Sequence, residues 1–384
     1  MNRSWDVIVV GARVAGAATA MLLARAGLRV LCLDRSRHGA DTLSTHALMR
    51  GGVLQLQKWG LLDALVSAGT PPVRRTVFHY GIEQVAVSIK PASGIDALYA
   101  PRRTVIDALL VDEAARSGAK IEFGSPVVGL CRESDGRVSG VTVHDPRTGL
   151  ERTEHAELIV GADGRGSLVA REVGAANVFP GQHAAAYLYG YWAGLPSDGY
   201  EWFYLPGLAA GVIPTNNGQA CVFVAGAPAR VDAAVRDGGS IAAFDGLADQ
   251  IGLGPRVRSA DRVGPIRYVR SLPPGYLRTA QGSGWALVGD AGHWMDPMST
   301  HGMTSALRDA ELLADSIISP AATSPGSVGS YQHTRDRLSL PMLQASDRIA
   351  SFGWDLVVIR DALRRMSSAM TDEVEALALL GSVA

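Results

Sequence analysis

The pattern of hydrophobic and polar positions is clearest over the first 34 residues. An apolar run of strand length at residues 5–10 leads into a turn that contains glycine, and a second apolar run ends at Asp34. Between them lies a segment of small and aliphatic residues, which indicates a helix that packs closely against both strands. The order strand, turn, helix, strand predicts a βαβ unit and a parallel α/β sheet.

Farther along the chain, helix and strand patterns alternate. Residues 54–69 and 102–118 have apolar positions at helical spacing. Residues 76–90 alternate polar and apolar side chains, as an antiparallel hairpin does. Residues 127–157 contain three strand patterns separated by turn sequences, which predict a small meander. We expect a separate short strand at residues 158–160.

The second half of the chain changes character twice. From about residue 177 to residue 275, short aromatic and β-branched runs are separated by glycine and proline, which predicts a second sheet. A strand pattern at residues 285–289 is followed by a helical pattern from about residue 303 to residue 318. Residues 331–352 are again helical in pattern, and we expect Pro341 to break that helix.

Composition and charge exclude several classes of protein. Lys and Arg total 36 against 37 Asp and Glu, so no basic field favours nucleic acid or an anionic membrane. The three cysteines are far apart and lack metal-binding spacing, which fits a reducing compartment. No apolar run reaches the roughly 18 residues of a membrane span, and the first apolar segment lacks signal-peptide features. We expect a soluble cytoplasmic monomer or homodimer.

The turn after the first strand carries an incomplete dinucleotide fingerprint. Gly11 and Gly16 occupy the outer glycine positions, but Arg13 stands where the middle glycine is usual. The helix that begins near Val14 presents unpaired N–H groups and a positive dipole end to a pyrophosphate. Asp34 is placed to accept ribose hydroxyls. The residues expected to contact the dinucleotide here are Gly11, Ala12, Arg13, Val14, Ala15, Gly16, Asp34 and Arg35.

Two further motifs, each at the end of a strand pattern, make a family visible. Residues 161–167 read GADGRGS, and residues 289–293 read GDAGH. Together with residues 11–16 and Asp34, they resemble the motifs of FAD-dependent monooxygenases related to p-hydroxybenzoate hydroxylase, the group A flavoprotein oxygenases. That family shares its glutathione-reductase-type FAD fold with flavin halogenases and geranylgeranyl reductases. The resemblance covers roughly residues 5–320 and implies FAD as the resident cofactor.

The resemblance also implies an architecture. The fold class is α/β, with a Rossmann-like FAD-binding domain of the glutathione-reductase type, an inserted antiparallel-sheet substrate domain and a helical C-terminal tail. The expected FAD-binding domain comprises residues 1–72, 101–176 and 277–326. The expected substrate domain comprises residues 73–100 and 177–276, and residues 327–384 form the C-terminal helices.

Individual FAD contacts follow from the matched motifs. By resemblance, Asp290 contacts the ribityl chain or the neighbouring ribose. The amides at Gly302 and Met303, where a helix begins, should point at the flavin N1 and C2 carbonyl and stabilise the reduced ring. Arg103 matches the arginine that begins the helix after the hairpin, although Arg102 is a rival for this register. The other residues expected at FAD are Ser44, Val128, Asp163 and Gly164.

Two histidines are candidates for catalysis. His301 stands where the family has a glutamine near the flavin ring, and a histidine there can donate a hydrogen bond or titrate near neutral pH. His46 lies in a loop that approaches the flavin in relatives. For each, the competing interpretation is a polar loop residue without chemistry. His293 is interpreted as structural.

The resemblance implies a reaction. NAD(P)H binds transiently and reduces FAD, and a flavin C4a-hydroperoxide formed with O2 transfers oxygen to an aromatic or polycyclic small molecule. Such a hydroxylase would fit secondary metabolism. The substrate pocket is expected between the second sheet and the flavin, although the same aromatic residues fit a core equally well. The expected wall residues are Tyr189, Tyr191, Trp202 and Tyr204.

Two alternatives stay open. Residues 200–206 read YEWFYLP, one residue off the YxWxFP signature of geranylgeranyl reductases, which would imply reduction of isoprenoid double bonds. We favour an ordinary aromatic strand there. A non-catalytic FAD-binding protein would keep the cofactor motifs and lack a productive pocket. The WxWxIP sequence of flavin halogenases is absent, as are a hydrolase triad and a metal-binding cluster.

Overall fold

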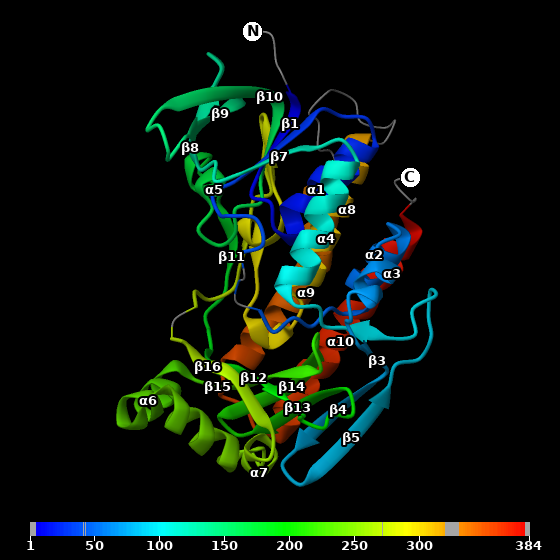
Figure 1. The fold of residues 1–384 in the computed structure, drawn as a ribbon, viewed down its shortest axis with the longest axis vertical. Coiled ribbons are helices and arrows are strands. Elements are labelled where there is room, and N and C mark those ends of the chain that lie inside the picture. The colour runs from blue at the N-terminus through cyan, green and yellow to red at the C-terminus, as the bar shows by residue number, and fades with distance from the viewer. Residues whose placement is uncertain (1–4, 41, 43, 271, 319–329, 381–384) are drawn as a thin grey trace.

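The first sheet confirms the predicted parallel α/β unit. The computed structural model describes residues 5–40, 42, 44–270, 272–318 and 330–380. The central strand β1 pairs in parallel with a strand on either side, and the sheet lies at the top of Figure 1. From one edge to the other, the strands are β18 (Gln281–Gly282), β19 (Trp285–Leu287), β10 (Glu151–Gly161), β1 (Trp5–Val10), β2 (Val30–Asp34) and β7 (Lys120–Phe123).

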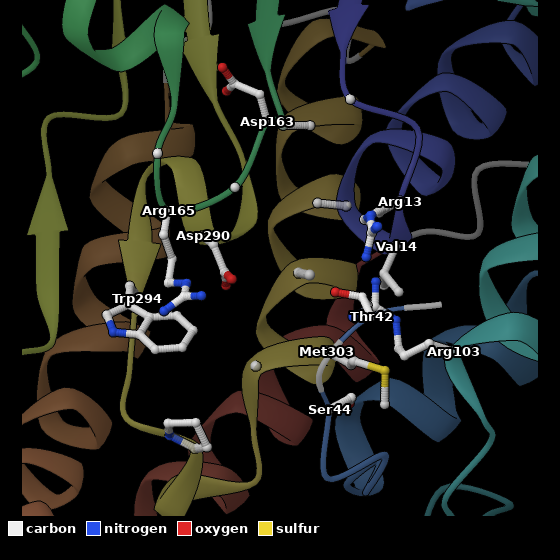
Figure 2. A pocket seen from close by; sticks show the side chains of 18 of the residues that line it. Arg13, Val14, Thr42, Ser44, Arg103, Asp163, Arg165, Asp290, Trp294 and Met303 are labelled. Carbon is white, nitrogen blue, oxygen red and sulfur yellow. The ribbon is translucent and has the colours of Figure 1, made fainter. Parts of the chain in front are cut away.

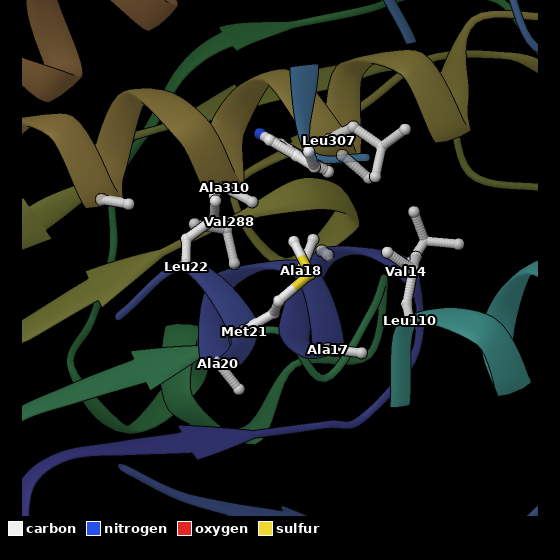
Figure 3. Close-up of a cluster of buried hydrophobic side chains, with 14 of the residues drawn as sticks. Val14, Ala17, Ala18, Ala20, Met21, Leu22, Leu110, Val288, Leu307 and Ala310 are labelled. Atoms are coloured by element: carbon white, nitrogen blue, oxygen red, sulfur yellow. The ribbon is translucent and has the colours of Figure 1, made fainter. Parts of the chain in front are cut away.

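Three helices cover one face of this sheet. They are α1 (Val14–Arg25), α4 (Arg103–Arg116) and α8 (Gly302–Ile318). Residues 14–24 of α1 are all buried, because α1 lies between the sheet and the other two helices. Figure 3 shows Ala18 of α1 on the side of Leu307 and Ala310 of α8, and Ala17 on the side of Leu110 of α4. Small side chains let these helices approach closely, as the sequence pattern predicts.

The predicted meander is present, but its last strand is longer than expected. β8 (Val127–Arg132) and β9 (Val138–His144) pair antiparallel, and β9 pairs with the first part of β10. The separate strand expected at residues 158–160 is wrong, since β10 continues without a break from Glu151 to Gly161. No glycine or proline interrupts it before Gly161, so one strand serves the meander and then the parallel sheet.

The second sheet is confirmed, and the predicted hairpin belongs to it. β4 of the hairpin pairs in parallel with β13, and the remaining neighbours are antiparallel. In order across the sheet, the strands are β16 (Asp261–Val269), β12 (Ala186–Ala193), β15 (Gln219–Gly226), β14 (Leu208–Thr215), β13 (Tyr200–Leu205), β4 (Arg75–Tyr80) and β5 (Glu83–Ser88). This sheet occupies the lower half of Figure 1.

Two helices were missed in the region interpreted as strands only. α6 (Pro228–Gln250) and α7 (Gly254–Arg258) pack on the outer side of the second sheet, where Phe244 stacks on Trp192 with ring centres 4.9 Å apart. α6 is interrupted at Gly239, where φ is +74°, which obscures its helical pattern. A second difference concerns residues 54–69, where we expected a single helix and the structure has two shorter helices.

Gly60 separates those two helices. α2 (Arg50–Lys58) and α3 (Leu62–Ser67) flank this residue, whose φ is +72°. Such a conformation ends a helix at a glycine. The short elements that complete the fold are β3 (Pro72–Val73), β6 (Leu98–Tyr99), α5 (Leu168–Glu172), β11 (Asn177–Pro180), β17 (Tyr276–Arg278), η1 (Gly289–Ala291), β20 (His293–Trp294) and η2 (Pro297–Ser299).

The C-terminal residues form two long helices. α9 (Tyr331–Ala350) continues through Pro341, so the expected break is wrong. A proline removes one backbone donor, and the buried residues Leu338 and Met342 hold both sides of the site against the core. α10 (Leu356–Leu379) packs against α9 and α2 (Figure 1). In the described ranges, no helix combines the length and apolar character that crossing a membrane requires.

Candidate functional site

A cavity of about 840 Å³ lies at the carboxyl ends of the parallel strands and extends to the second sheet. Figure 2 shows Arg165, Asp290 and Trp294 on one side of it, and Arg13 and Arg103 on the other. Most of the residues expected at the cofactor line this cavity. They are Gly11, Arg13, Val14, Ala15, Asp34, Arg35, Ser44, Arg103, Asp163, Gly164, Asp290, Gly302 and Met303.

The two fingerprint glycines are required by packing. A Cβ on Gly11, whose φ is +105°, would lie 2.4 Å from the carbonyl oxygen of Ala162. A Cβ on Gly16 would lie 1.8 Å from the carbonyl oxygen of Gly11, so Gly16 sits behind the cavity wall. Arg13 instead has φ −90° and ψ −168°, which any residue adopts. The middle position therefore accepts a side chain, and that of Arg13 faces the cavity.

Asp34 holds the turn that precedes α1. Its Oδ2 accepts a hydrogen bond from the Ala12 amide at 2.7 Å, and its Oδ1 accepts from the Ser36 amide at 2.7 Å. The Ser36 hydroxyl donates to Oδ1 as well, at 2.5 Å. Ala12 therefore lies beside Asp34, outside the cavity lining. The carboxylate is nearly buried but still reaches the cavity, so it shapes the turn as well as the cavity wall.

Asp290 follows β19 in the short helix η1 and is available to a ligand. In the described parts of the chain, its carboxylate has no hydrogen-bond partner, while its backbone oxygen accepts from the Tyr276 hydroxyl at 2.6 Å. Burial raises the pKa of Asp290 to about 6, although Arg165 and Arg103 oppose this rise. The guanidinium of Arg165 lies 4.7 Å from the ring centre of Trp294. A hydroxyl group of a bound molecule could donate a hydrogen bond to the Asp290 carboxylate.

The loop that contains Asp163 is fixed by a helix cap. Asp163 accepts from the Ser167 hydroxyl at 2.5 Å and from the Leu168 amide at 2.6 Å, at the start of α5. Gly164 has φ +77° and open space around its missing Cβ. On β8, strand alternation turns Val127 into the cavity, whereas Val128 lies outside the lining and is 43% exposed. The structure thus places the Val128 side chain away from the predicted site.

The structure also distinguishes Arg103 from Arg102, the two candidates for the arginine expected at the start of α4. Arg103 lines the cavity and binds the Asp107 carboxylate through two contacts of 3.1 and 3.0 Å. Arg102 points away from the lining, and its guanidinium lies 3.8 Å from the ring centre of Tyr191. Of this pair, Arg103 is placed to meet a ligand.

The two candidate histidines differ in position. His301 is among the residues that line the cavity, and His46 is not, although its neighbours Thr45 and Ala47 are. His46 is buried, with φ +64° and its Nε2 2.6 Å from the Tyr191 hydroxyl. Burial, followed by the charges of Arg102 and Arg103, lowers the pKa of His46 to about 3. The His46 ring is therefore neutral over the ordinary pH range.

The second sheet supplies an aromatic end to the cavity. Of the four expected wall residues, Tyr189 lines it. Tyr191 is paired with His46, Trp202 packs against Phe223 with ring centres 6.3 Å apart, and Tyr204 packs against Trp354 at 6.1 Å. The aromatic and apolar residues that do line this end are Tyr187, Tyr189, Phe223, Val269, Leu272, Trp294, Met295 and Pro297.

Several lining residues were not predicted from the sequence. Arg165 and Leu272 lie in loops and Trp294 lies in the two-residue strand β20, where neither helical nor strand periodicity predicts which side chain faces inward. Arg165 follows Asp163-Gly164 directly, so the motif itself was the available signal. Whether Trp294 and Leu272 face the cavity depends on how the second sheet packs against the first, which the local sequence does not indicate.

The residues present fit a dinucleotide with an attached ring. The first turn of α1 presents its amides to the cavity, and Gly11 and Gly164 leave the backbone bare beside it. Charged residues of both signs gather at this end, which suits a pyrophosphate and ribose hydroxyls. The opposite end is apolar and suits a flat ring system.

Comparison with known proteins agrees with this geometry. Residues 4–232 match the sequence model of the FAD binding domain family. The menaquinone reductase of Mycolicibacterium smegmatis is 29% identical over 346 residues, which cover 84% of this chain and 78% of that protein. The digeranylgeranylglycerophospholipid reductase of Methanocella arvoryzae is 31% identical over 179 residues, 45% of this chain and 43% of that protein.

One solved structure illustrates the likeness of fold. PqsL from Pseudomonas aeruginosa, described as a probable FAD-dependent monooxygenase, superposes with a TM-score of 0.77 at 18% identity. The superposition covers 96% of this chain and 99% of that one. At this identity the likeness establishes a shared fold.

Proposed function

Since the chain belongs to the FAD binding domain family, we propose that it is an FAD-dependent monooxygenase that hydroxylates an uncharged aromatic or polycyclic small molecule. NAD(P)H and O2 are its proposed co-substrates. The observation that carries the proposal is the single cavity that joins a charged end, at the parallel strands, to an aromatic end, at the second sheet. Such a cavity can hold a cofactor and a substrate side by side.

At the charged end, the chain's residues would bind and orient FAD. The amides of Val14 and Ala15, with Arg13 beside them, would hold the pyrophosphate. Asp290 would accept a hydroxyl of the ribityl chain or ribose. The start of α8 at Met303 would direct its unpaired amides at the ring. Bound FAD supplies the electron transfer and oxygen activation.

At the aromatic end, the chain would exclude water and position the substrate. Tyr187 donates its hydroxyl proton to Asp296 and accepts from the Met298 amide at 3.1 Å, so its polar atom is fully used. Burial, followed by the charge of Asp296, raises the pKa of Tyr187 well above its usual value. The ring stays neutral, and the side chains that the second sheet contributes to this end, Tyr187, Tyr189, Phe223 and Val269, are uncharged. We therefore propose an uncharged substrate.

We assign His301, ahead of His46, as the histidine that meets the bound molecules. His301 lines the cavity, whereas the Nε2 of His46 faces Tyr191 behind it. His46 would support the wall that Ser44 and Ala47 form. This assignment concerns position and does not require either ring to act as a base.

Oxygen-dependent turnover tests the proposed reaction. The purified protein, loaded with FAD, is incubated with NADPH or NADH and a panel of phenols and indoles, and O2 consumption and products are measured together. The expected product carries one added oxygen atom from O2, and its amount rises with NAD(P)H oxidised. Products that contain no oxygen from labelled O2 across the panel would contradict hydroxylation.

A second candidate is reduction of an isoprenoid double bond. The observation that favours it is the menaquinone reductase of M. smegmatis, which resembles 84% of this chain. The aromatic strand β13 gives it no support, because Trp202 and Tyr204 lie outside the cavity lining. Anaerobic incubation of the reduced protein with a menaquinone discriminates: two hydrogens that stay on the isoprenoid chain after the quinone ring is reoxidised support reduction of a double bond. FAD retention without either product would leave a non-catalytic FAD-binding protein.

A further inference from the structure

A row of aromatic side chains crosses the second sheet at the aromatic end of the cavity. Tyr189 of β12 is paired with Phe223 of β15. On its other side, Phe223 is paired with Gly211 of β14, which in turn is paired with Trp202 of β13. Residues directly opposite one another on neighbouring antiparallel strands share a face of the sheet. Over these four strands, the row therefore consists of three rings and one position, Gly211, without a side chain.

The cavity ends within this row. Tyr189 and Phe223 line it, whereas Gly211 and Trp202 lie outside the lining. The Phe223 ring lies over Gly211, because a Cβ on Gly211 would be 2.5 Å from Phe223 Cε1 and 2.9 Å from Trp202 Cε3. The ring centres of Phe223 and Trp202 are 6.3 Å apart. Phe223 is therefore the wall at which the aromatic end stops.

The glycine at residue 211 serves packing and not an unusual backbone conformation. Gly211 lies in the middle of β14 and is not among the glycines with positive φ. A glycine inside a strand weakens that strand, and it often marks a place where another group closely approaches the backbone. Here the approaching group is the Phe223 ring, whose Cε1 and Cζ occupy the space of the missing Cβ.

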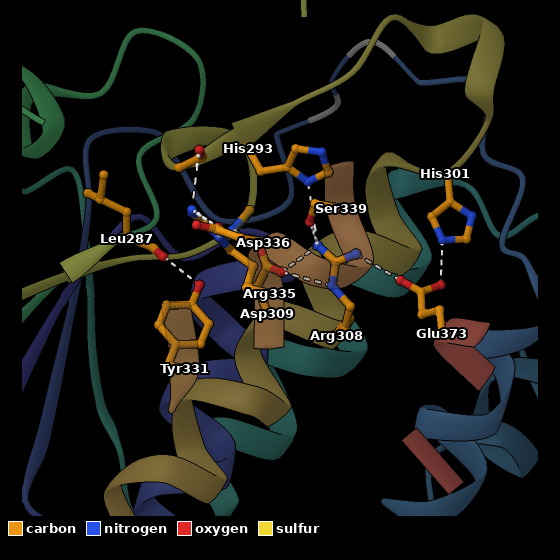
Figure 4. A network of polar contacts seen from close by, with 12 residues as sticks. Leu287, His293, His301, Arg308, Asp309, Tyr331, Arg335, Asp336, Ser339 and Glu373 are labelled. Atoms are coloured by element: carbon orange, nitrogen blue, oxygen red, sulfur yellow. Dashed lines mark hydrogen bonds and ion pairs between the residues drawn. The ribbon is translucent and has the colours of Figure 1, made fainter. Parts of the chain in front are cut away.

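A buried polar network fixes the side of the cavity that α8 forms (Figure 4). Glu373 of α10 lies 2.6 Å from His301, which lines the cavity, and 3.0 Å from Arg308 of α8. Arg308 also donates to Asp309 at 2.7 Å, and the other oxygen of Asp309 accepts from the Gly289 amide at 3.1 Å. These contacts hold the start of α8 and the turn after β19 in place. The second sheet is therefore the side on which the size of the aromatic end is decided.

The rings on either side of Phe223 are also held. The Tyr187 ring lies edge-on to Phe223 with ring centres 6.1 Å apart, and two hydrogen bonds fix its hydroxyl. Trp202 packs against the buried Tyr200, with ring centres 5.8 Å apart. The free volume next to Phe223 is the cavity itself. A side chain at Gly211 should therefore push the Phe223 ring into the cavity.

We propose that Gly211 is a specificity-determining residue, which sets the length of the ring system that the aromatic end accepts by letting Phe223 lie against β14. The proposal rests on the proposed function, in which this end holds the substrate. A fused ring system needs the space that Gly211 provides, whereas a single ring does not. One methyl group in an apolar pocket is enough to change discrimination between ligands about tenfold or more.

Binding of two phenols of different size tests the proposal. Phenol and 2-naphthol each carry one hydroxyl, are uncharged at neutral pH and differ by one fused ring. Calorimetric titration of the oxidised, FAD-loaded protein without NAD(P)H gives both affinities and involves no oxygen chemistry. Gly211→Ala should lower the affinity for 2-naphthol about tenfold relative to that for phenol. An unchanged relative affinity, or an unaltered protein that binds neither phenol, would overturn the proposal.

The proposed reaction is tested separately, by supplying the same complexes with NAD(P)H and O2. A bound phenol that is never hydroxylated would count against the monooxygenase reaction. The size preference and its dependence on Gly211 would still stand in that case, because they are measured as binding.

Gly190→Ala is the matched control for crowding in the same sheet. Gly190 lies on β12 but faces α6, together with Trp192, which stacks on Phe244. A Cβ there would lie 2.9 Å from Ile266 Cδ1 and 3.1 Å from Trp192 Cζ3, and Gly190 is outside the cavity lining. The variant should lose stability as Gly211→Ala does but keep the relative affinity of the unaltered protein. An equal fall of the relative affinity in both variants would overturn the proposal.

Phe223→Leu keeps the proposal testable if Gly211→Ala does not fold. It withdraws the wall and leaves Gly211 in place, so the affinity for 2-naphthol relative to phenol should rise about fivefold. Loosened packing alone would not favour the larger ligand. The double variant Gly211→Ala/Phe223→Leu should regain the relative affinity that Gly211→Ala loses, because the shorter leucine leaves room for the methyl group. A relative affinity that does not rise in Phe223→Leu, or is not regained in the double variant, would overturn the proposal.

Discussion

At the scale of single residues, Asp34 has two roles that a substitution should separate. Its carboxylate holds the amides of Ala12 and Ser36, and it also lines the cavity. We expect Asp34→Ala to destabilise the apoprotein by about 1–3 kcal/mol, because buried amide donors lose their acceptor. It should also weaken FAD binding. Chemical denaturation and FAD titration measure the two effects, and full FAD retention would contradict the cofactor contact.

Arg13 is the side chain at the usual glycine position, and its charge faces the proposed pyrophosphate site. Arg13→Gly should raise the FAD dissociation constant by about fivefold, or about 1 kcal/mol, and reduce its dependence on salt. Glycine is tolerated at this N-terminal cap position, so folding should be preserved. Arg147→Gly, at a side chain 91% exposed in a turn, is the control that should leave affinity unchanged. Tighter binding by Arg13→Gly would show that the side chain obstructs the cofactor.

Asp290 should make the stability of the apoprotein depend on pH. Its folded pKa is about 6 against a usual 3.8, so the folded state keeps a proton that the unfolded state loses. The stability this contributes is present at low pH and is lost as pH rises through about 4 to 6, by about 3 kcal/mol in total. Asp290→Asn should lack this loss, as denaturation at several pH values would show. Asp361→Asn, at an exposed site, should follow the unaltered protein.

At the scale of elements, the approach of α1 to the strand ends is the most demanding contact. Gly16→Ala would place a Cβ 1.8 Å from the carbonyl oxygen of Gly11, and backbone cannot yield as a side chain can. We expect a loss of about 3 kcal/mol or more of unfolding free energy, with loss of FAD. Gly166→Ala is the matched control, because nothing lies within 4 Å of its missing Cβ. Similar melting temperatures for the two variants would contradict this packing.

Elements with a strong period could be predicted from the sequence, and the others could not. β1, α1 and β2 combine an uninterrupted apolar pattern with a glycine turn, so their identity and the site at their ends followed directly. α6 is interrupted at Gly239, and its pattern is lost among the neighbouring strands. α9 passes through Pro341 because tertiary packing outweighs one missing hydrogen bond, which no local rule contains. Local patterns decide elements only where packing does not overrule them.

The site was predictable as far as motifs fix the backbone. Gly11, Asp163 and Asp290 line the cavity as expected, because each follows a strand end. Trp202 and Tyr204 do not line it, because strand alternation tells which residues share a face but not what covers that face. The contact of Glu373 with His301 joins residues 72 positions apart and has no sequence signal.

At the scale of the whole molecule, Arg308 ties three helices together. It contacts Glu373 of α10 and Ser339 of α9 from its place on α8, at 0% exposure. Arg308→Met would leave the buried Glu373 and Asp309 carboxylates without this partner, and we expect a loss of about 3–5 kcal/mol. Arg365→Met, at a side chain 76% exposed, should be near neutral. Thermal unfolding followed by helix content and by FAD release should shift together in Arg308→Met.

The burial of α1 has a consequence for the order in which the molecule is made. α1 ends at residue 25, yet its outer face is covered by α8, which begins at residue 302. On the ribosome, the first helix and its fingerprint turn therefore emerge long before the helix that shields them. The apolar outer face of α1 therefore stays uncovered in the nascent chain until residues 302–318 have been synthesised. The cavity, which Gly302 and Met303 of α8 help to line, is likewise incomplete until that helix has folded against α1.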